Sequence, residues 1–316
     1  MHEIPIPRIE PFDTADITAR YIDPEMPVVI SGWAANWPAR HKWQPEYLGR
    51  VAGNIRVPAI ESDSGKFPDF NPHAKVRAIE VDFADYLESI VNGHEQARRR
   101  LINGDVTPLV LDNGHPHEVF GALLGDVEQP GWIAPSALHY MGLWTSGAGV
   151  RSWLHYDNNG MHNCNVQVKG RKRVLLFAPS QCSLLYPHMF VKHGPGSSQF
   201  SQVDVAAPDL ERFPRFADAM AMVTVLEEGD AVFFPAYWYH SFEHLGAINV
   251  NVNFWWRPAR YLLNAVTIRR RLWSALARVL LPEEEQPKAA AITAALRALP
   301  AETRAVLAAL EEKLQG

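Results

Sequence analysis

The sequence has few of the features that mark secreted or membrane-spanning proteins. It contains only two cysteines, Cys164 and Cys182, among 316 residues, which is too few for a disulfide framework. No stretch approaches the roughly 18 consecutive apolar residues of a membrane helix. The first residues, Met-His-Glu-Ile-Pro-Ile-Pro, have neither the basic nor the apolar region of a signal peptide. These absences predict a protein of the reducing cytoplasm that does not associate with membranes.

The sequence also lacks a large excess of positive charge. The formal net charge is -5 and the isoelectric point is about 6.2, which argues against a surface that binds a polyanion. The three arginines at 98–100 could still form a local basic patch. We therefore do not expect nucleic acid to be a partner. With 47% hydrophobic residues, the chain can bury the core of one large domain, or of a domain with an appendage.

Three residues carry the strongest chemical signal. His155 and Asp157 stand in a His-Tyr-Asp sequence, and His240 follows far downstream in Trp-Tyr-His. Side chains two residues apart on an extended strand point the same way, so the first two can reach one ion. Two imidazoles and one carboxylate are the facial ligand set of mononuclear Fe(II) oxygenases, which leaves other positions open for a co-substrate and dioxygen. A lone His-x-Asp arises easily by chance, so the surrounding sequence has to decide.

Two segments near these residues alternate in an unusual way. In residues 163–168, Asn and Gln alternate with Cys and Val, and in residues 248–254 three asparagines alternate with Ile, Val and Phe. This is the pattern of strands with one apolar and one polar face. Exposure of the polar face is the ordinary alternative for such strands. Asparagine, however, is a poor strand former, and we interpret the rows as facing the interior of a small barrel, where hydrogen-bond partners would satisfy them.

Lys172 begins the strand that follows a turn at Lys169-Gly170. Alternation places it on the face opposite Leu175 and Phe177. A strand lysine usually keeps its charged head in water, and that alternative stays open because four basic residues crowd positions 169–173. Inside a barrel, the ammonium could instead pair with the distal carboxylate of a 2-oxo acid.

The stretch from about Trp144 to Trp256 resembles the JmjC/cupin-type 2-oxoglutarate oxygenases. Within that family it is most similar to the asparaginyl hydroxylase type, that of factor inhibiting hypoxia-inducible factor. Several motifs in the same order are far more specific than any one of them. They are Leu-His-Tyr-Asp at 154–157, Gln-Val-Lys-Gly-Arg-Lys-Arg at 167–173, Ser-Gln-Val-Asp at 201–204, Pro-Ala-Tyr-Trp-Tyr-His at 235–240 and Val-Asn-Phe-Trp at 252–255.

The resemblance implies a role for each matched position. His155, Asp157 and His240 match the ligands of Fe(II), and Lys172 matches the lysine that pairs with the distal carboxylate of 2-oxoglutarate. Ser152 stands where the family usually has a threonine hydroxyl on the same carboxylate. Two further positions, Asn163 and Asn253, match asparagines beside the metal-binding end of the co-substrate.

Other polar residues are predicted to have lesser roles. The family's upstream tyrosine at the co-substrate has no clear match, and Tyr140 is only a weak stand-in. His162 is interpreted as a flexible loop histidine. The remaining histidines are interpreted as structural or exposed; those nearest the motifs are His139, His188, His193 and His244.

The predicted fold is mainly β: a double-stranded β-helix, the jelly-roll barrel of cupins, with flanking N-terminal helices and a C-terminal helical segment. Residues 1–258 would form the catalytic domain, with the barrel core at about 131–258. From 259 to 316 the apolar spacing becomes helical, and the resulting stripe has to pack against something. Docking on the barrel is the simplest arrangement, whereas the resemblance implies a homodimer through these helices.

The expected function is that of an Fe(II)- and 2-oxoglutarate-dependent dioxygenase. It would use O2 to hydroxylate a C–H bond on a protein or peptide side chain, with succinate and CO2 as co-products. Three alternatives stay open, because cupin barrels serve many chemistries: hydroxylation of a small molecule or tRNA base, a metal-binding cupin that does not use 2-oxoglutarate, and a catalytically silent binding protein.

Overall fold

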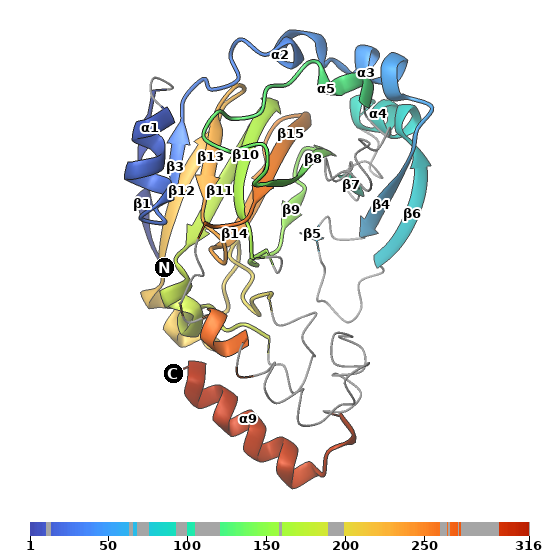
Figure 1. Ribbon diagram of the computed structural model, residues 1–316. Helices are drawn as coiled ribbons and strands as arrows, with labels where there is room; N and C mark the ends of the chain where they lie inside the picture. Colours follow the sequence, from blue (N-terminus) through green and yellow to red (C-terminus); the bar gives the residue numbers. More distant parts are fainter. Residues whose placement is uncertain are drawn as a thin grey trace.

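The computed structural model describes most of the chain (Figure 1). The described residues form two packed β-sheets with helices around them, and the predicted jelly-roll barrel is confirmed. Most neighbouring strands are antiparallel. The described residues are 1–10, 14–62, 66–67, 76–92, 100–104, 121–157, 160–188, 199–259, 264, 266–270, 272 and 297–315.

The smaller sheet has six strands. Its order is β1 (His2–Pro5), β12 (Met220–Leu226), β11 (Lys172–Phe177), β14 (Tyr239–His244), β9 (Arg151–Ser152) and β5 (Lys66–Phe67). The larger sheet has nine strands. Its order is β2 (Arg8–Ile9), β3 (Val28–Ile30), β13 (Ala231–Phe234), β10 (His162–Lys169), β15 (Ile248–Trp256), β8 (Leu138–Gly147), β7 (Arg100–Gly104), β4 (Arg56–Ser62) and β6 (Val76–Asp82).

The N-terminal region contributes strands as well as the predicted helices. β1 pairs in parallel with β12, and β3 pairs with β13, so the first 30 residues extend both sheets. Sequence alternation cannot reveal such pairings, because the partners lie about 200 residues away. The described helices and helical turns are α1 (Thr14–Ile17), η1 (Thr18–Ile22), α2 (Pro38–Lys42), α3 (Pro45–Ala52), α4 (Phe83–Val91), α5 (Gly121–Leu124), η3 (Pro179–Leu185), η4 (Pro214–Asp218) and α9 (Ala301–Gln315).

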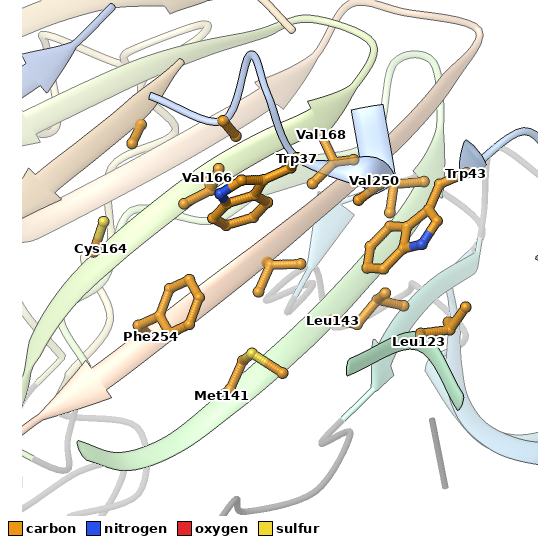
Figure 2. Close-up of a cluster of buried hydrophobic side chains, with 14 of the residues drawn as sticks. Trp37, Trp43, Leu123, Met141, Leu143, Cys164, Val166, Val168, Val250 and Phe254 are labelled. Atoms are coloured by element: carbon orange, nitrogen blue, oxygen red, sulfur yellow. The ribbon is translucent and has the colours of Figure 1, made fainter. Parts of the chain in front are cut away.

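The outer face of the large sheet is apolar and is covered by the N-terminal helical region. Figure 2 shows Trp37 and Trp43, at the two ends of α2, over valines of β10 and β15. The apolar members of both alternating segments point into this cluster, since Cys164, Val166 and Phe254 belong to it. Burial of this surface is the main attraction between the helices and the sheet.

The amide rows of β10 and β15 lie on the other face, inside the barrel. Their six members are each at most 3% exposed, so the prediction that the rows face inward is confirmed; they are Asn163, Asn165, Gln167, Asn249, Asn251 and Asn253. Across the interior, Val174 and Leu176 of β11 are buried with Phe234 of β13. The barrel interior therefore has an apolar side and an amide-lined side.

The C-terminal region contains a buried ion pair, and its Arg269 also donates a hydrogen bond to the His188 carbonyl at 2.8 Å, which links it to the rest of the fold. Arg269, in the helical residues 266–270, contacts Glu311 of α9 at 2.5 Å, and the two side chains are 5% and 0% exposed. Figure 1 shows α9 at the end of the molecule opposite α2 and α3. Val306 and Leu310 of the predicted stripe are 59% and 52% exposed. These two residues are therefore not buried against the barrel, although α9 itself contacts η3. The first predicted apolar run lies mostly outside the described residues.

Two features of the composition also have a structural counterpart. Both cysteines are free and buried. No helix among the described residues has the length and apolar character needed to cross a lipid bilayer. The Arg98-Arg-Arg sequence falls largely outside the described residues.

Candidate metal centre

The structure brings His155, Asp157 and His240 together. One possible ligand atom from each lies within 4.8 Å of the others. His155 follows the short strand β9 and forms an isolated antiparallel bridge with His240 of β14. The two residues exchange backbone hydrogen bonds, at 3.1 Å from His155 N to His240 O and 2.6 Å in the other direction. The backbone therefore fixes the separation of the two imidazoles, whose ring centres are 4.3 Å apart.

Each imidazole is oriented by a carbonyl two residues earlier in the chain. His155 Nδ1 lies 2.7 Å from the Trp153 oxygen, and His240 Nδ1 lies 3.0 Å from the Trp238 oxygen. A carbonyl can only accept, so both Nδ1 atoms carry the proton. The lone pair is left on Nε2, the nitrogen that faces the other two residues. Such outer contacts fix the tautomer in metal-binding histidines.

The Asp157 carboxylate is divided between two tasks. Its Oδ2 accepts hydrogen bonds from Trp255 Nε1 at 3.0 Å and from Asn163 Nδ2 at 3.3 Å. Its Oδ1 lies 3.5 Å from His240 Nε2 and 3.9 Å from His155 Nε2. One oxygen is thus held by the protein while the other is directed at the space between the imidazoles, an arrangement suited to a single bond to an ion.

The electrostatics favour the protonation states that metal ligands need. Burial, together with neighbouring His240, lowers the pKa of His155 to about 4, with Asp157 acting in the opposite direction. For Asp157, burial acts to raise the pKa, but both histidines and the Trp255 indole outweigh it, so this pKa lies below the ordinary value. At neutral pH the site holds a carboxylate and a neutral imidazole, as metal binding requires. Two nitrogens and one oxygen suit Fe(II) and related divalent ions.

The two asparagines assigned to the co-substrate form a chain of amides leading away from Asp157. Asn163 donates to Asp157, Asn253 Nδ2 donates to Asn163 Oδ1 at 3.0 Å, and Asn251 donates to Asn253 Oδ1. All three are buried in the barrel interior. Polar groups are therefore continuous from the candidate metal centre into the barrel.

Lys172 lies in the same interior, 1% exposed. Its Nζ donates to Asn165 Oδ1 and lies 4.9 Å from the centre of the Phe242 ring. Burial lowers its pKa well below the ordinary value. No carboxylate among the described residues pairs with it. The surface alternative for this lysine is thus wrong, and a buried ammonium without an anion is costly.

Ser152 occupies the end of β9 beside the same region. Its Oγ accepts the Phe242 backbone N–H at 2.8 Å, and its carbonyl accepts a hydrogen bond from the Ser241 hydroxyl at 2.7 Å. The Ser152 hydroxyl keeps its own proton for a further hydrogen bond.

Tyr140 lies beside Trp255, whose indole donates a hydrogen bond to Asp157 at the metal end of the barrel. The Tyr140 ring stacks on Trp255, with centres 4.3 Å apart and an interplanar angle of 18°. Lys172 is instead level with His244, which contacts Ser146, six residues further along β8. The assignment of Tyr140 as a weak stand-in for the tyrosine that the resemblance implies stays a prediction.

The interpretation of His162 as a flexible loop residue is wrong. It is the first residue of β10, 3% exposed, and its Nδ1 accepts the Ala236 N–H at 3.2 Å. Its ring packs against Phe233 and Trp256 on the outer face of the sheet. His162 stands two residues before Cys164 on the same strand, so alternation would have predicted that its side chain lies on the apolar outer face. His193 lies outside the described residues.

Three contributors to the interior were missed by sequence reasoning. Trp255 donates to Asp157, and Asn165 accepts from Lys172. His244, predicted as structural or exposed, is buried as the direct cross-strand neighbour of Lys172. The sequence could have predicted the position of His244, because it stands four residues after His240 on the same strand and therefore lies on the same face.

The fold and this constellation define a cupin-type barrel with a candidate mononuclear metal centre. The model of the cupin-like domain family matches residues 14–260, and the chain belongs to this family.

Several curated proteins are similar to it. A chicken (Gallus gallus) tRNA wybutosine-synthesizing protein 5 is 32% identical, over 72% of this chain and 70% of that protein. Lysine-specific demethylase JMJ31 of Arabidopsis thaliana is 28% identical, over 75% and 47%. Lysine-specific demethylase 8 of Xenopus tropicalis is 29% identical, over 80% and 53%. The chain thus spans about half the length of the two demethylases. These relatives support the JmjC/cupin-type family and not its asparaginyl hydroxylase type specifically.

Proposed function

We propose that this protein is an Fe(II)- and 2-oxoglutarate-dependent dioxygenase that hydroxylates a C–H bond. One observation carries the proposal: the buried Lys172 amine, which has no carboxylate partner among the described residues, shares the barrel interior with three converging metal-ligand side chains. A metal-binding cupin that needs no acidic co-substrate would have no reason to bury a cation there. An incoming carboxylate offsets the burial cost of Lys172.

The spacing between the two features suits the co-substrate. The Lys172 ammonium lies against the ring of Phe242, two residues from His240 on β14. Two strand residues span ~7 Å. A five-carbon 2-oxo diacid can bridge that separation, with its oxo-acid end at the metal and its far carboxylate at the ammonium.

Each residue would have a defined task. His155, Asp157 and His240 would hold Fe(II); Lys172 and Ser152 would bind the distal carboxylate of 2-oxoglutarate, and Asn163 and Asn253 would line its metal-binding end. The bound ion and co-substrate supply the oxidative chemistry, in which O2 is consumed and succinate and CO2 are released. The protein contributes orientation. Trp255 keeps the carboxylate of Asp157 turned toward the ion.

The substrate we favour is a protein or peptide side chain, the asparaginyl type among them. Relatives named lysine-specific demethylases support a protein substrate. The relative named for tRNA wybutosine synthesis favours a tRNA base as the second candidate. The net charge of -5 weighs against that candidate, because tRNA binding depends on positive charge. A homodimer through the C-terminal helices, a cytoplasmic location and a catalytic domain at 1–258 also stay as proposals.

Succinate release tests the proposal. Purified protein with Fe(II), ascorbate and 2-oxoglutarate is assayed alone and with cell extract. The extract should stimulate release, and prior protease or ribonuclease treatment tells protein from tRNA substrate. His155→Ala and Asp157→Ala should abolish release, whereas His41→Ala, at an exposed histidine of α2, should not. Undiminished release in either ligand variant contradicts the assignment.

A separate measurement addresses the cupin that does not use 2-oxoglutarate. Anaerobic titration of the Fe(II) protein with 2-oxoglutarate should produce a weak visible charge-transfer band when the 2-oxo acid chelates the metal. Lys172→Met should weaken the titration without changing Fe(II) binding. Absence of the band in the unaltered protein would favour the rival function.

A further inference from the structure

A polar pair closes the barrel interior on the side of Lys172 that faces away from the candidate metal centre. Ser146 of β8 and His244 of β14 are 0% and 7% exposed, and the serine Oγ contacts the histidine Nδ1. β8 belongs to the large sheet and β14 to the small one, so the contact joins the two sheets across the interior.

Their depth follows from the strand registers. His244 is the direct cross-strand partner of Lys172, and it lies four residues after His240 on the same face of β14. At ~3.3 Å per residue it is ~13 Å from the level of His240. The Lys172 ammonium bends back toward the metal centre and contacts Phe242, half-way between the two histidines. A carboxylate on this ammonium would have the His244 ring directly beyond it.

Neighbouring side chains hold this end of the barrel in place. Asn249 is the cross-strand partner of Ser146; its Oδ1 accepts from Gln167 Nε2 at 3.3 Å and its Nδ2 donates to the Gly246 carbonyl at 2.8 Å. All these side chains are neutral amides or hydroxyls. Burial, and then the charge of Lys172, lowers the pKa of His244 to about 3. The ring is therefore neutral and carries no positive charge that would compete with the ammonium for an incoming carboxylate.

We propose that the Ser146–His244 pair is the floor of the co-substrate pocket and limits the length of the 2-oxo acid that binds. The pair admits a five-carbon diacid whose far carboxylate stops at Lys172, and it excludes a diacid longer by one methylene. This inference rests on the proposed function, because it takes the chelating metal and Lys172 as the two ends of the pocket. Ser146 acts through His244 by fixing its ring, and is a positioning residue.

The proposed length limit can be tested by measuring the binding of two 2-oxo acids to the protein, which does not require catalytic turnover. The protein is loaded with Mn(II) and titrated calorimetrically with 2-oxoglutarate and with 2-oxoadipate, which is one methylene longer. The unaltered protein should prefer 2-oxoglutarate by at least about tenfold, the range expected for one methylene in a closed pocket. His244→Ala should reduce that preference about tenfold, chiefly by admitting 2-oxoadipate. Ser146→Ala, which frees the ring, should reduce it by less.

A matched control separates this role from a general loss of structure. His162→Ala removes an equally buried histidine from the outer face of the large sheet, and its preference should stay within about twofold of the unaltered protein. If folded His244→Ala keeps the original preference, or loses both acids by the same factor, the floor is refuted. Should His244→Ala not fold, an unchanged preference in Ser146→Ala refutes it.

The failure of this inference can be told from the failure of the proposed function. If the unaltered Mn(II) protein binds both acids equally well, the length limit is wrong while the proposed function stands. If it binds neither acid, both are wrong. Lys172→Met should lose affinity for both acids, because it removes the cation that both carboxylates need.

Discussion

The two ends of the barrel interior are built on different principles. At the metal end, the charge of Asp157 is already compensated by two N–H donors, from Trp255 and Asn163, and both histidines are held by carbonyls. At the other end, the partners of Lys172 among the described residues are a neutral amide oxygen and the face of a phenyl ring. The first end is complete as a set of ligands before an ion arrives. The second is incomplete without an anion.

This difference teaches where binding energy resides. Burying a charge costs several kcal/mol unless hydrogen bonds and an opposite charge offset the loss of water. Asp157 has the hydrogen bonds, so replacing one of its partners should weaken ion binding only in part. Lys172 lacks an opposite charge among the described residues. A carboxylate that binds beside it would therefore supply most of the electrostatic stabilisation of the buried ammonium. We expect the lysine end to dominate co-substrate affinity and the metal end to dominate geometry.

The largest effect is expected at Lys172. Truncation of one partner of a buried charge pair costs about 2–5 kcal/mol, so Lys172→Met should weaken 2-oxoglutarate binding about 30-fold or more, measured calorimetrically on the Mn(II) protein. Mn(II) affinity itself should be unchanged. Lys169→Met is the control, because Lys169 is also buried but lies 3.9 Å from Glu228. If Lys169→Met lost as much 2-oxoglutarate affinity as Lys172→Met, the special role of Lys172 in co-substrate binding would be contradicted.

The next effect is expected at Trp255, which contacts the metal ligand and not the metal. Trp255→Phe removes the 3.0 Å hydrogen bond to Asp157 Oδ2. Outer contacts of this kind are worth about 10–100-fold in metal affinity, so Fe(II) or Mn(II) should bind that much more weakly in a competition titration. Trp132→Phe is the control, since the Trp132 indole N–H is buried without a hydrogen-bond partner in the described structure. Equal losses in the two variants would contradict the role of Trp255.

A smaller effect is expected at Ser152, whose hydroxyl accepts the Phe242 N–H at 2.8 Å and would donate its own proton to the distal carboxylate of 2-oxoglutarate. A hydrogen bond of this kind is worth about 1 kcal/mol. Ser152→Ala should therefore weaken 2-oxoglutarate binding about fivefold, and Ser152→Thr should leave it nearly unchanged. If Ser152→Ala binds as tightly as the unaltered protein, the hydroxyl does not contact the carboxylate.

The pH dependence of stability should distinguish the two ends without any ligand. Burial lowers the pKa of Lys172 below 10.5 in the folded protein. Between the lowered value and 10.5 the unfolded chain therefore holds a proton that the folded protein has released, and folding stability rises with pH through that range. Below it, both states are protonated and the full cost of the buried charge remains.

Lys172→Met should remove this rise. Urea unfolding of the ligand-free proteins at a series of alkaline pH values would measure it, and other titrating groups cancel in the difference between the two proteins. If the unfolding free energies of the two proteins change with pH in parallel, Lys172 is not a buried cation that lacks an anionic partner.

Alternation in the sequence was enough to predict which side chains share one face of a strand. It was not enough to predict which side chains contact one another across the barrel. It predicted that His155 and Asp157 point the same way and that Lys172 lies opposite Leu175. The poor strand propensity of asparagine then indicated that the polar row of β15 faces inward. Alternation could not say which side chains meet across the barrel, because strand order depends on long-range pairing. Asn165 as the partner of Lys172, and Ser146 as the partner of His244, appear only when β8, β10, β11 and β14 are brought together.

The C-terminal region shows the same limit for helices. A period of about four residues correctly predicted a helix that includes Val306 and Leu310. It also suggested that these residues contact the barrel, yet they are exposed, and the buried position is Glu311 with Arg269. A hydropathy pattern places any charged residue, including Glu311, on the exposed face of a helix. Its burial depends on a partner 42 positions away, which the pattern does not contain.

The backbone bridge between His155 and His240 has a consequence for how the protein would acquire its ion. Because peptide groups set the spacing of the two rings, stripping the ion with a chelator should leave a folded apoprotein that can be reloaded. The ion that occupies the centre would then be set largely by the relative supply of iron, manganese and zinc in the cell, since the intrinsic affinity of such a site gives iron no advantage over zinc. Activity in the cell would follow iron availability and not the amount of protein alone.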